Sequence, residues 1–497
     1  MASGVAYKPD AYHADRAGLT EKAKKFYILA GEEAAHAYQN SLAIESYTHA
    51  LRLSAIENIQ ERIDLLLGRA ALYRIIGDST GQEQDLATLE LLAERQKNKR
   101  NLAVVILRQA DFAFDKGKLQ EAQSLAQRSI EIAESVQALD VAAHAYRILP
   151  LTLARQGQIK EAIRLAQIGL QLTQQVKDRE SEGQIFNELG LITLEQRETD
   201  QSRDYFEKSL LIARETSNRR LEAQVLNNMG LIFGMYENDY TTARKYFEKI
   251  LAIVQEIGNR NGEGYALENL GWATSMRGDF EMALHYLMEA LTISRETGNH
   301  SQEGNILVNL SAMMVTQGNY SEALVHTIQA LKISRDIGER SIEAWSLLYL
   351  GHANLGSGNY QEALNAYQKA FDIRQLLEQY SLSMETLAGL AQVELQSGNL
   401  ANALSHAEKI LKHLTDGGNL EGTEEPLRIY HSVYQVLTEN GDPRADKVLE
   451  NAYSILKEQA SKIHEQAYKD IFIQNVPWRR EIEKIWMKNQ AEKKQDS

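Results

Sequence analysis

Hydrophobic, small and polar positions recur along this chain with a step of 40 residues. Residues 277–284, 317–324 and 357–364 share one motif. It consists of a glycine, then Asn or Asp, then an aromatic residue, and an Ala-Leu pair that begins three positions after the aromatic residue. Weaker copies continue in both directions. The turn positions of the eleven copies are Tyr38, Gly77, Gly117, Gly157, Arg197, Asn238, Gly278, Gly318, Gly358, Gly398 and Asn440. A fixed period of this length is typical of a repeat protein, in which each repeat packs on its neighbours.

Each copy predicts two helices, here called helix A and helix B. In the seventh copy, residues on one helix face follow the i, i+3, i+4, i+7 spacing at Leu267, Leu270, Gly271 and Thr274. This spacing predicts a helix A near residues 264–276. Gly278 supplies the left-handed residue after it, and Asp279 is the expected N-cap of helix B. The copy before this one follows a one-residue insertion.

Small residues are expected to let the helices approach closely. In helix B the inward positions of three successive copies hold Ala283 and Ala290, Ala323 and Ala330, and Ala363 and Ala370. A large side chain at these places would overpack the contact between helices. Asn319 with Glu322, and Asn359 with Glu362, have the spacing of a capping-box variant at the start of helix B.

The repeat resembles the tetratricopeptide repeat in its longer form of roughly 40 residues. The seventh copy carries the pattern as Leu270-Gly271, Gly278-Asp279-Phe280, Ala283, Leu287 and Ala290. The resemblance covers roughly residues 24 to 458. It implies an all-α, right-handed α-α superhelical solenoid of about eleven helix pairs with a C-terminal capping helix. We expect a lead-in helix in residues 1–23, the array in 24–458, and a capping helix and tail in 459–497.

Composition narrows the class of protein. The net charge of −14 repels phosphate backbones and anionic lipid, so we expect neither nucleic acid nor membrane as a partner. Cysteine is absent, which excludes disulfides and thiolate chemistry. We found no signal peptide and no apolar run long enough for a membrane span, and we expect a cytoplasmic protein. Pro150 stands at the glycine position of one helix A and predicts a bend.

The two ends of the chain carry a second resemblance. Residues 13–34, from His13-Ala14-Asp15-Arg16-Ala17-Gly18-Leu19 to Gly31-Glu32-Glu33-Ala34, resemble the segment that follows the ATPase module of bacterial signal-transduction ATPases of the STAND type. Residues 468–482 resemble the tail that closes such arrays. This resemblance implies a sensor region whose partner is an ATPase module of the full-length protein. The phosphate-binding motif G-x-x-x-x-G-K-[ST] is itself absent from this chain.

We find no pattern that predicts an enzyme. The twelve histidines include no H-E-x-x-H motif. His406 and His413 share a helix face without a third ligand. Neither the G-x-S-x-G motif of hydrolases nor the glycine fingerprint of dinucleotide binding is present. We therefore expect no catalytic residues, no metal and no cofactor.

A binding groove is the site that the sequence favours. In a tetratricopeptide superhelix helix A lines the concave groove, and the position two before the Leu-Gly glycine faces it. That position holds Glu188, Asn228, Asn269, Asn309 and Tyr349 in copies five to nine. The three asparagines resemble the asparagine ladder with which related arrays hold a peptide backbone, since an amide both donates and accepts. The predicted groove residues are Asn187, Asn227, Asn228, Tyr265, Glu268, Asn269, Trp272, Asn305, Asn309, Trp345, Tyr349 and His352, with Met276 beside them.

Two functions remain open from the sequence. The first is a sensor that binds a protein, a peptide or a small effector in the groove. The second is a constitutive scaffold that joins two proteins without a signalling ligand. Residues 478–494 form an amphipathic segment with Ile482, Ile485 and Trp486 on one side, which predicts a helix that caps the last repeat.

Overall fold

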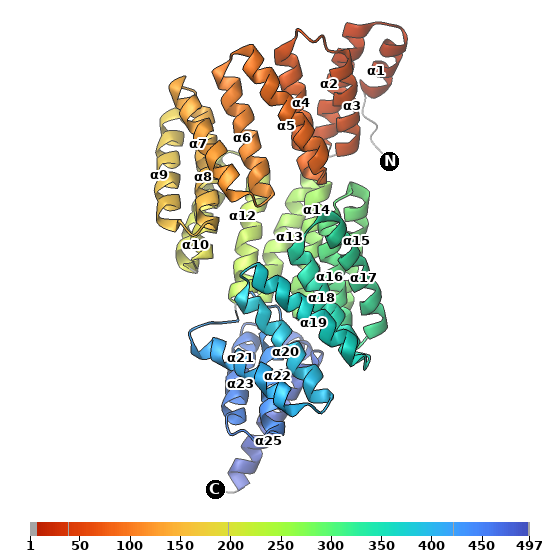
Figure 1. Cartoon of the computed structure of the whole chain (residues 1–497), viewed down its shortest axis with the longest axis vertical. Coiled ribbons are helices and arrows are strands. Elements are labelled where there is room, and N and C mark those ends of the chain that lie inside the picture. Colours follow the sequence, from red (N-terminus) through yellow and green to blue (C-terminus); the bar gives the residue numbers. More distant parts are fainter. Residues whose placement is uncertain (1–6, 38, 197, 421, 496–497) are drawn as a thin grey trace. The chain divides into compact units, whose positions relative to one another are not determined.

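Helices are the only regular elements in the part of the chain that the structure describes. The computed structural model describes residues 7–495 except 38, 197 and 421 (Figure 1). Successive helices pack on one another and form eleven pairs, from α2 with α3 to α22 with α23. The first helix of each pair is a helix A and the second a helix B. The expected all-α solenoid of about eleven helix pairs is therefore confirmed.

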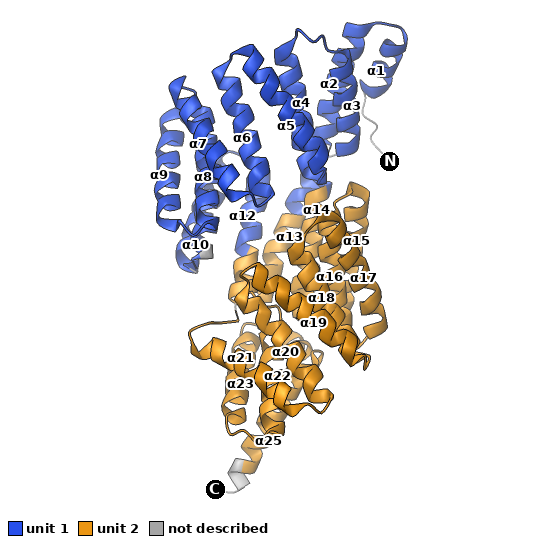
Figure 2. Ribbon diagram, viewed as in Figure 1, with its two compact units in different colours: residues 1–229, 252–260 blue, residues 230–251, 261–497 orange. Residues whose placement is uncertain are grey.

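The chain divides into two compact units (Figure 2). Unit 1 comprises residues 1–229 and 252–260. Its helices are α1 (Tyr7–Arg16), α2 (Thr20–His36), α3 (Asn40–Leu53), α4 (Ile59–Ile76), α5 (Ser79–Gln96), α6 (Lys99–Asp115), α7 (Leu119–Ser135), α8 (Leu139–Arg155), α9 (Ile159–Val176), α10 (Arg179–Glu195), α11 (Thr199–Glu215) and most of α12 (Arg219–Leu231).

Unit 2 comprises residues 230–251 and 261–497. Its helices are η1 (Ile232–Tyr236), most of α13 (Tyr240–Glu256), α14 (Arg260–Met276), α15 (Phe280–Thr297), α16 (His300–Gln317), α17 (Tyr320–Ile337), α18 (Arg340–Gly356), α19 (Tyr360–Leu376), α20 (Tyr380–Gln396), α21 (Leu400–Thr415), α22 (Pro426–Glu439), α23 (Ala445–Ser461), α24 (Gln466–Gln474) and α25 (Pro477–Gln495). The domain boundaries drawn from the sequence at residues 23 and 458 stay predictions.

Left-handed residues separate the two helices of most pairs, as the glycine pattern predicts. Positive φ angles are found at Gly77, Gly117, Gly157, Asn238, Gly278, Gly318, Gly358 and Gly398. Tyr38 and Arg197, the turn positions of two other copies, lie outside the described residues. In the last pair the left-handed residue is Gly441 rather than Asn440, because glycine adopts positive φ without a steric cost.

The predicted caps of helix B were right in one case and wrong in two. The Asp279 side chain accepts a hydrogen bond from the Met282 N–H at 3.5 Å. Asn319 and Asn359 cap nothing, so the capping-box variant was wrong. Their amides turn back to the preceding helix A instead: the Asn319 amide donates to the Met314 sulfur, and that of Asn359 to the Asn354 side chain.

Two local features of helix A differ from the prediction. The helix of the seventh pair, α14, begins at Arg260 rather than near Gly264, because two early glycines weaken the helix signal there. Packing explains the glycine at position 264, because a Cβ there would lie 2.9 Å from the Gln302 side chain. In the sixth pair the one-residue insertion is absorbed by a π-helical turn, η1, that continues α12.

Pro150 does not interrupt its helix. α8 runs as one helix from Leu139 to Arg155, and the proline is buried within it. The bend at Pro150 stays a prediction.

Small residues set the distance between helices. The predicted inward alanines of α15, α17 and α19 are fully buried. A Cβ on Gly271 of α14 would lie 2.6 Å from Leu287 of α15, closer than real contacts allow. Helix A therefore carries glycine where helix B of the same pair presses a large side chain against it.

Gly271→Val is expected to lower the free energy of unfolding by about 2–3 kcal/mol, because the side chain has no room beside Leu287. Ser311 occupies the equivalent position of the next pair, so Ser311→Ala serves as the control and should cost about 1 kcal/mol or less. Denaturant unfolding followed by tryptophan fluorescence measures both in unit 2, which contains all the tryptophans of the chain. A Gly271→Val protein as stable as the wild type would contradict this account.

Candidate functional site

The residues predicted to line the groove are divided between the two units. Asn187, Asn227 and Asn228 belong to unit 1, and the other nine belong to unit 2. Within unit 1 the amide of Asn228 donates a hydrogen bond to the Asn187 side-chain oxygen at 2.9 Å, and Asn187 is buried. These two members of the predicted set therefore contact each other. Their role in binding a ligand stays a prediction.

Three predicted residues of unit 2 line one cavity of about 180 Å³, here called the inner cavity. They are Asn269, Trp272 and Trp345, and Tyr240 and Glu424 also line it. Trp272 meets Tyr240 edge to face, with ring centroids 5.9 Å apart. The π-helical turn makes room for this indole, since a Cβ on Gly234 would lie 2.7 Å from it. The insertion in the sequence therefore shapes a wall of the cavity.

Other predicted residues of α14 contact the next repeat. The Tyr265 hydroxyl accepts a hydrogen bond from the Asn299 amide at 3.1 Å, although its ring remains exposed. Glu268 is buried and accepts a bond from the Gln302 amide at 3.3 Å. Burial raises the pKa of the Glu268 carboxyl to about 8. Asn305 and Asn309 lie half-buried on α16.

The last two predicted residues, Tyr349 and His352, belong to a buried polar cluster on α18. The Tyr349 hydroxyl donates to the Glu424 carboxylate, and its ring stacks on Trp345 with centroids 6.3 Å apart. His352 Nδ1 is hydrogen-bonded to the Tyr367 hydroxyl at 2.6 Å. Burial and the nearby Arg428 charge hold the pKa of His352 well below its usual value, so the ring is neutral at pH 7.

Charged residues that sequence reasoning missed complete this cluster. The Arg374 guanidinium is 1% exposed and lies 4.3 Å above the Trp345 ring. Glu385 is also buried, and its Oε1 accepts a bond from the Glu425 N–H at 3.2 Å. Burial, followed by the neighbouring Glu424 charge, raises the pKa of Glu385 to about 8. Burial raises that of Glu424 to about 7.

A loop places two of these carboxylates inside unit 2. Glu424 and Glu425 end the connection between α21 and α22, which is longer than the other connections between pairs. The sequence signal was present: the step from Gly398 to Asn440 is 42 residues instead of 40, and the stretch Asp-Gly-Gly-Asn-Leu-Glu-Gly-Thr-Glu-Glu follows residue 415 within this step. An insertion that carries charge into a repeat array is a candidate for a binding or locking function.

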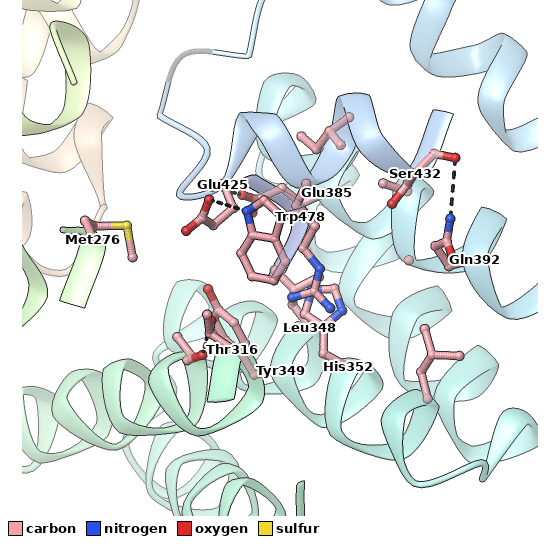
Figure 3. A pocket seen from close by; sticks show the side chains of 16 residues that line it. Met276, Thr316, Leu348, Tyr349, His352, Glu385, Gln392, Glu425, Ser432 and Trp478 are labelled. Carbon is pink, nitrogen blue, oxygen red and sulfur yellow. Dashed lines mark hydrogen bonds between the residues drawn. The ribbon is translucent and has the colours of Figure 1, made fainter. Parts of the chain in front are cut away.

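The helices A of five pairs line one pocket together with an indole. Figure 3 shows Trp478, at the start of α25, in a pocket lined by side chains from α14, α16, α18, α20 and α22. The Trp478 indole N–H donates to the Glu425 carboxylate at 2.9 Å, and the Arg428 guanidinium lies 4.9 Å above its ring. The remaining free volume of about 30 Å³ holds about one water molecule.

An open groove of about 600 Å³, here called the outer groove, adjoins the Trp478 pocket. Side-chain amides and aromatic rings line it, with one guanidinium. Its lining includes Tyr320, Tyr360, Gln396, Arg428, His431 and Gln435. Unlike the buried cluster, this groove is accessible to a partner.

Raising the pH is expected to weaken unit 2. The folded-state pKa of Glu385, about 8, lies above the ordinary value of 4.5, so its stabilising contribution is present at low pH and is lost as the pH rises through about 8. The free energy of unfolding should fall by up to about 1.4 kcal/mol per pH unit for this group. Glu385→Gln should reduce this dependence between about pH 5 and pH 9, measured by urea unfolding with tryptophan fluorescence. An identical pH dependence in the variant would contradict the assignment.

Comparison with known proteins identifies the type of repeat. The family model of the tetratricopeptide repeat matches residues 222–296, 302–375 and 342–416. Similar solved structures include aspartyl phosphate phosphatase F from Bacillus subtilis, at 16% identity, covering 72% of this chain and 94% of that chain, with a TM-score of 0.47. A signal transduction ATPase with numerous domains (STAND) and a tetratricopeptide repeat sensor, from Pyrococcus horikoshii, has 16% identity, coverages of 91% and 74%, and a TM-score of 0.44. Yeast Tom70 has 16% identity, coverages of 91% and 99%, and a TM-score of 0.39. No curated protein matches the chain.

Two features are absent from the described residues. No helix among them is long and apolar enough to cross a membrane. They also contain no group of three or more His, Asp or Glu side chains that could hold a metal ion.

Proposed function

We propose that this chain, whose helix pairs are tetratricopeptide repeats, binds a protein or peptide partner with the helix-A side of unit 2. The observation that carries the proposal is the convergence of five helices A on a segment of the chain itself, in the Trp478 pocket. A surface that already holds a peptide segment by an indole and by carboxylate hydrogen bonds has the chemistry to hold another. Repeat arrays commonly use such surfaces for binding.

The outer groove offers the partner a polar, accessible surface. Gln396 and Gln435 present side-chain amides, which match the donor and acceptor of a peptide unit. Tyr360 is exposed at the edge of the groove and offers an aromatic contact. The inner cavity, with Asn269 and two indoles, would receive a side chain of the partner. Together these features favour an extended peptide over a small, enclosed ligand.

A peptide library displayed on phage and selected on the intact chain provides the probe for this proposal. The selected peptides are then titrated by calorimetry against the wild type, Gln396→Ala and Asn269→Ala. Each lost hydrogen bond should weaken binding about five-fold, the equivalent of about 1 kcal/mol. Gln361→Ala, an exposed position on helix B of the ninth pair, is the matched control and should change nothing. Unchanged binding in every variant would contradict the proposed surface.

The finer proposal is that this array senses a ligand for a signal-transduction ATPase. It is supported by the resemblance of residues 13–34 and 468–482 to segments of such proteins. The reading frame that encodes the chain tests it: a nucleotide-binding module in the same frame supports the sensor. Absence of such a module would favour the constitutive scaffold, in which the same surface joins two proteins.

A further inference from the structure

The C-terminal segment of the chain folds back onto a turn about 200 residues upstream. The Asn475 amide donates to the Gly278 carbonyl at 2.9 Å, in the turn between α14 and α15. The Arg277 guanidinium, in the same turn, lies 4.4 Å above the Tyr468 ring. A Cβ on Gly278 would lie 2.8 Å from the Ile471 carbonyl oxygen, so the two backbones approach closely. Residues 466–486, here called the tail, therefore contact repeats at both ends of unit 2.

Arg479 is the centre of this contact. It is 1% exposed, and its guanidinium donates to the Met276 carbonyl at 2.7 Å and to both oxygens of Glu425 at 3.0 and 3.3 Å. It also lies 4.1 Å above the Phe472 ring. Trp478 shares the Glu425 carboxylate through its indole N–H. One carboxylate thus recognises an adjacent Trp-Arg pair in the first turn of a helix.

The Glu425 carboxylate would lose its ion-pair partner without the tail. Arg479 pairs with it at 3.0 Å, and the Glu425 side chain is only 12% exposed. A site vacated by the tail would therefore hold a largely buried carboxylate without this guanidinium, which favours a ligand that brings a cation.

The tail can leave without disturbing the order of the repeats. It follows the last repeat pair, after α23. Within α24 only Phe472 is buried, which leaves most of that helix in contact with solvent. The attachment combines the Trp-Arg pair, Asn475 and the stack of Trp486 on Tyr453, whose ring centroids are 4.8 Å apart. Three apolar side chains of the tail are also buried in the core of unit 2, namely Phe472, Val476 and Ile482.

We propose that the Glu425 site recognises a peptide in which an aromatic residue followed by arginine begins a helix, and that the tail is a built-in competitor for it. This inference rests on the proposed function and names the chemistry of the partner. The partner gains access by displacing the tail, and its guanidinium replaces that of Arg479 at Glu425. The arginine is specific because its two terminal nitrogens serve different acceptors: Nη2 donates to the Glu425 carboxylate and Nη1 to the Met276 carbonyl. The single nitrogen of a lysine cannot reproduce this planar arrangement.

A labelled peptide with the sequence of residues 464–490 tests the exchange on the full chain. Fluorescence anisotropy is measured with the wild type, with Arg479→Lys, which weakens the tail but keeps its charge, and with Arg480→Lys, the exposed neighbour. The peptide should bind Arg479→Lys at least about ten-fold more tightly than the wild type or Arg480→Lys. Adding Glu425→Gln to Arg479→Lys should remove at least about ten-fold of this affinity. A peptide carrying Trp478→Ala and Arg479→Ala should not bind.

Equal binding to all three chains, or no saturable binding to folded Arg479→Lys, would overturn the proposal. Hydrogen exchange on the wild type covers the case in which that variant does not fold. An excess of unlabelled peptide should speed hydrogen exchange in residues 466–486 and leave the hydrogen exchange of α16 and α18 unchanged. An unchanged rate of hydrogen exchange in the tail would refute its displacement by the peptide. If the peptide does not displace the tail, the phage-selected peptides still test whether the outer groove binds a partner. The proposed function and the proposed competition by the tail can therefore be refuted independently.

Discussion

Replacing Arg479 with methionine is expected to lower the free energy of unfolding of unit 2 by about 3–5 kcal/mol, the usual cost of breaking a buried ion pair by removing one partner. Methionine keeps much of the side-chain volume, so the loss comes mainly from the charge and its hydrogen bonds. Glu425 would be left with an uncompensated carboxylate, and the Met276 carbonyl would lose its side-chain donor. The contact joins residues more than 200 positions apart, so its loss also frees the C-terminal end of unit 2.

Arg480→Met is the matched control, because Arg480 is exposed and adjacent in sequence. It should change the free energy of unfolding by less than about 0.5 kcal/mol. Denaturant unfolding followed by tryptophan fluorescence reports on unit 2 alone. Adding Glu425→Gln to Arg479→Met should recover part of the loss, since it removes the unpaired charge. If Arg479→Met were as stable as Arg480→Met, the ion pair would not hold the tail.

The repeat pattern predicted the helix pairs because the contacts within a pair are local. Gly278 ends one helix, Asp279 begins the next, and Ala283 packs against the first, all within six residues. The same local pattern predicted the wrong cap at Asn319, because capping depends on the orientation of the side-chain amide, and this amide is hydrogen-bonded to Met314. It also shifted the last turn by one residue to Gly441.

The candidate site could be predicted only in part, because its remaining members meet through the tertiary fold. Helical spacing placed Asn269, Trp272 and Trp345 on the same side, and they share the inner cavity. No periodicity could indicate that Glu425 and Arg479, from a loop and a tail outside the repeat, would form a buried pair. The segment 478–494 was expected to cap the last repeat. The tail does pack on that repeat, but it also reaches the turn of the seventh pair.

Tyr367→Ala is expected to cost about 3–5 kcal/mol of unfolding free energy, the range for removing a buried aromatic ring. The ring is fully buried between α18 and α20: a Cβ on Gly351 would lie 2.5 Å from it, and one on Gly389 would lie 2.4 Å from it. Its hydroxyl also satisfies His352 Nδ1. Alanine would leave both a cavity between two repeats and an unpaired imidazole nitrogen.

Two further variants at this position separate the causes of that loss. Tyr367→Phe keeps the ring and should cost about 1–3 kcal/mol, for the unsatisfied nitrogen of buried His352. Tyr367→Leu copies the seventh pair, where Leu287 packs on Gly271, and should retain more stability than alanine because it fills part of the cavity. All three are measured by denaturant unfolding with tryptophan fluorescence. If Tyr367→Ala lost no more unfolding free energy than Tyr367→Phe, the glycines of α18 and α20 would not serve to make room for the ring. The pairing of a glycine in helix A with a large side chain in helix B would then not set the spacing of the repeats.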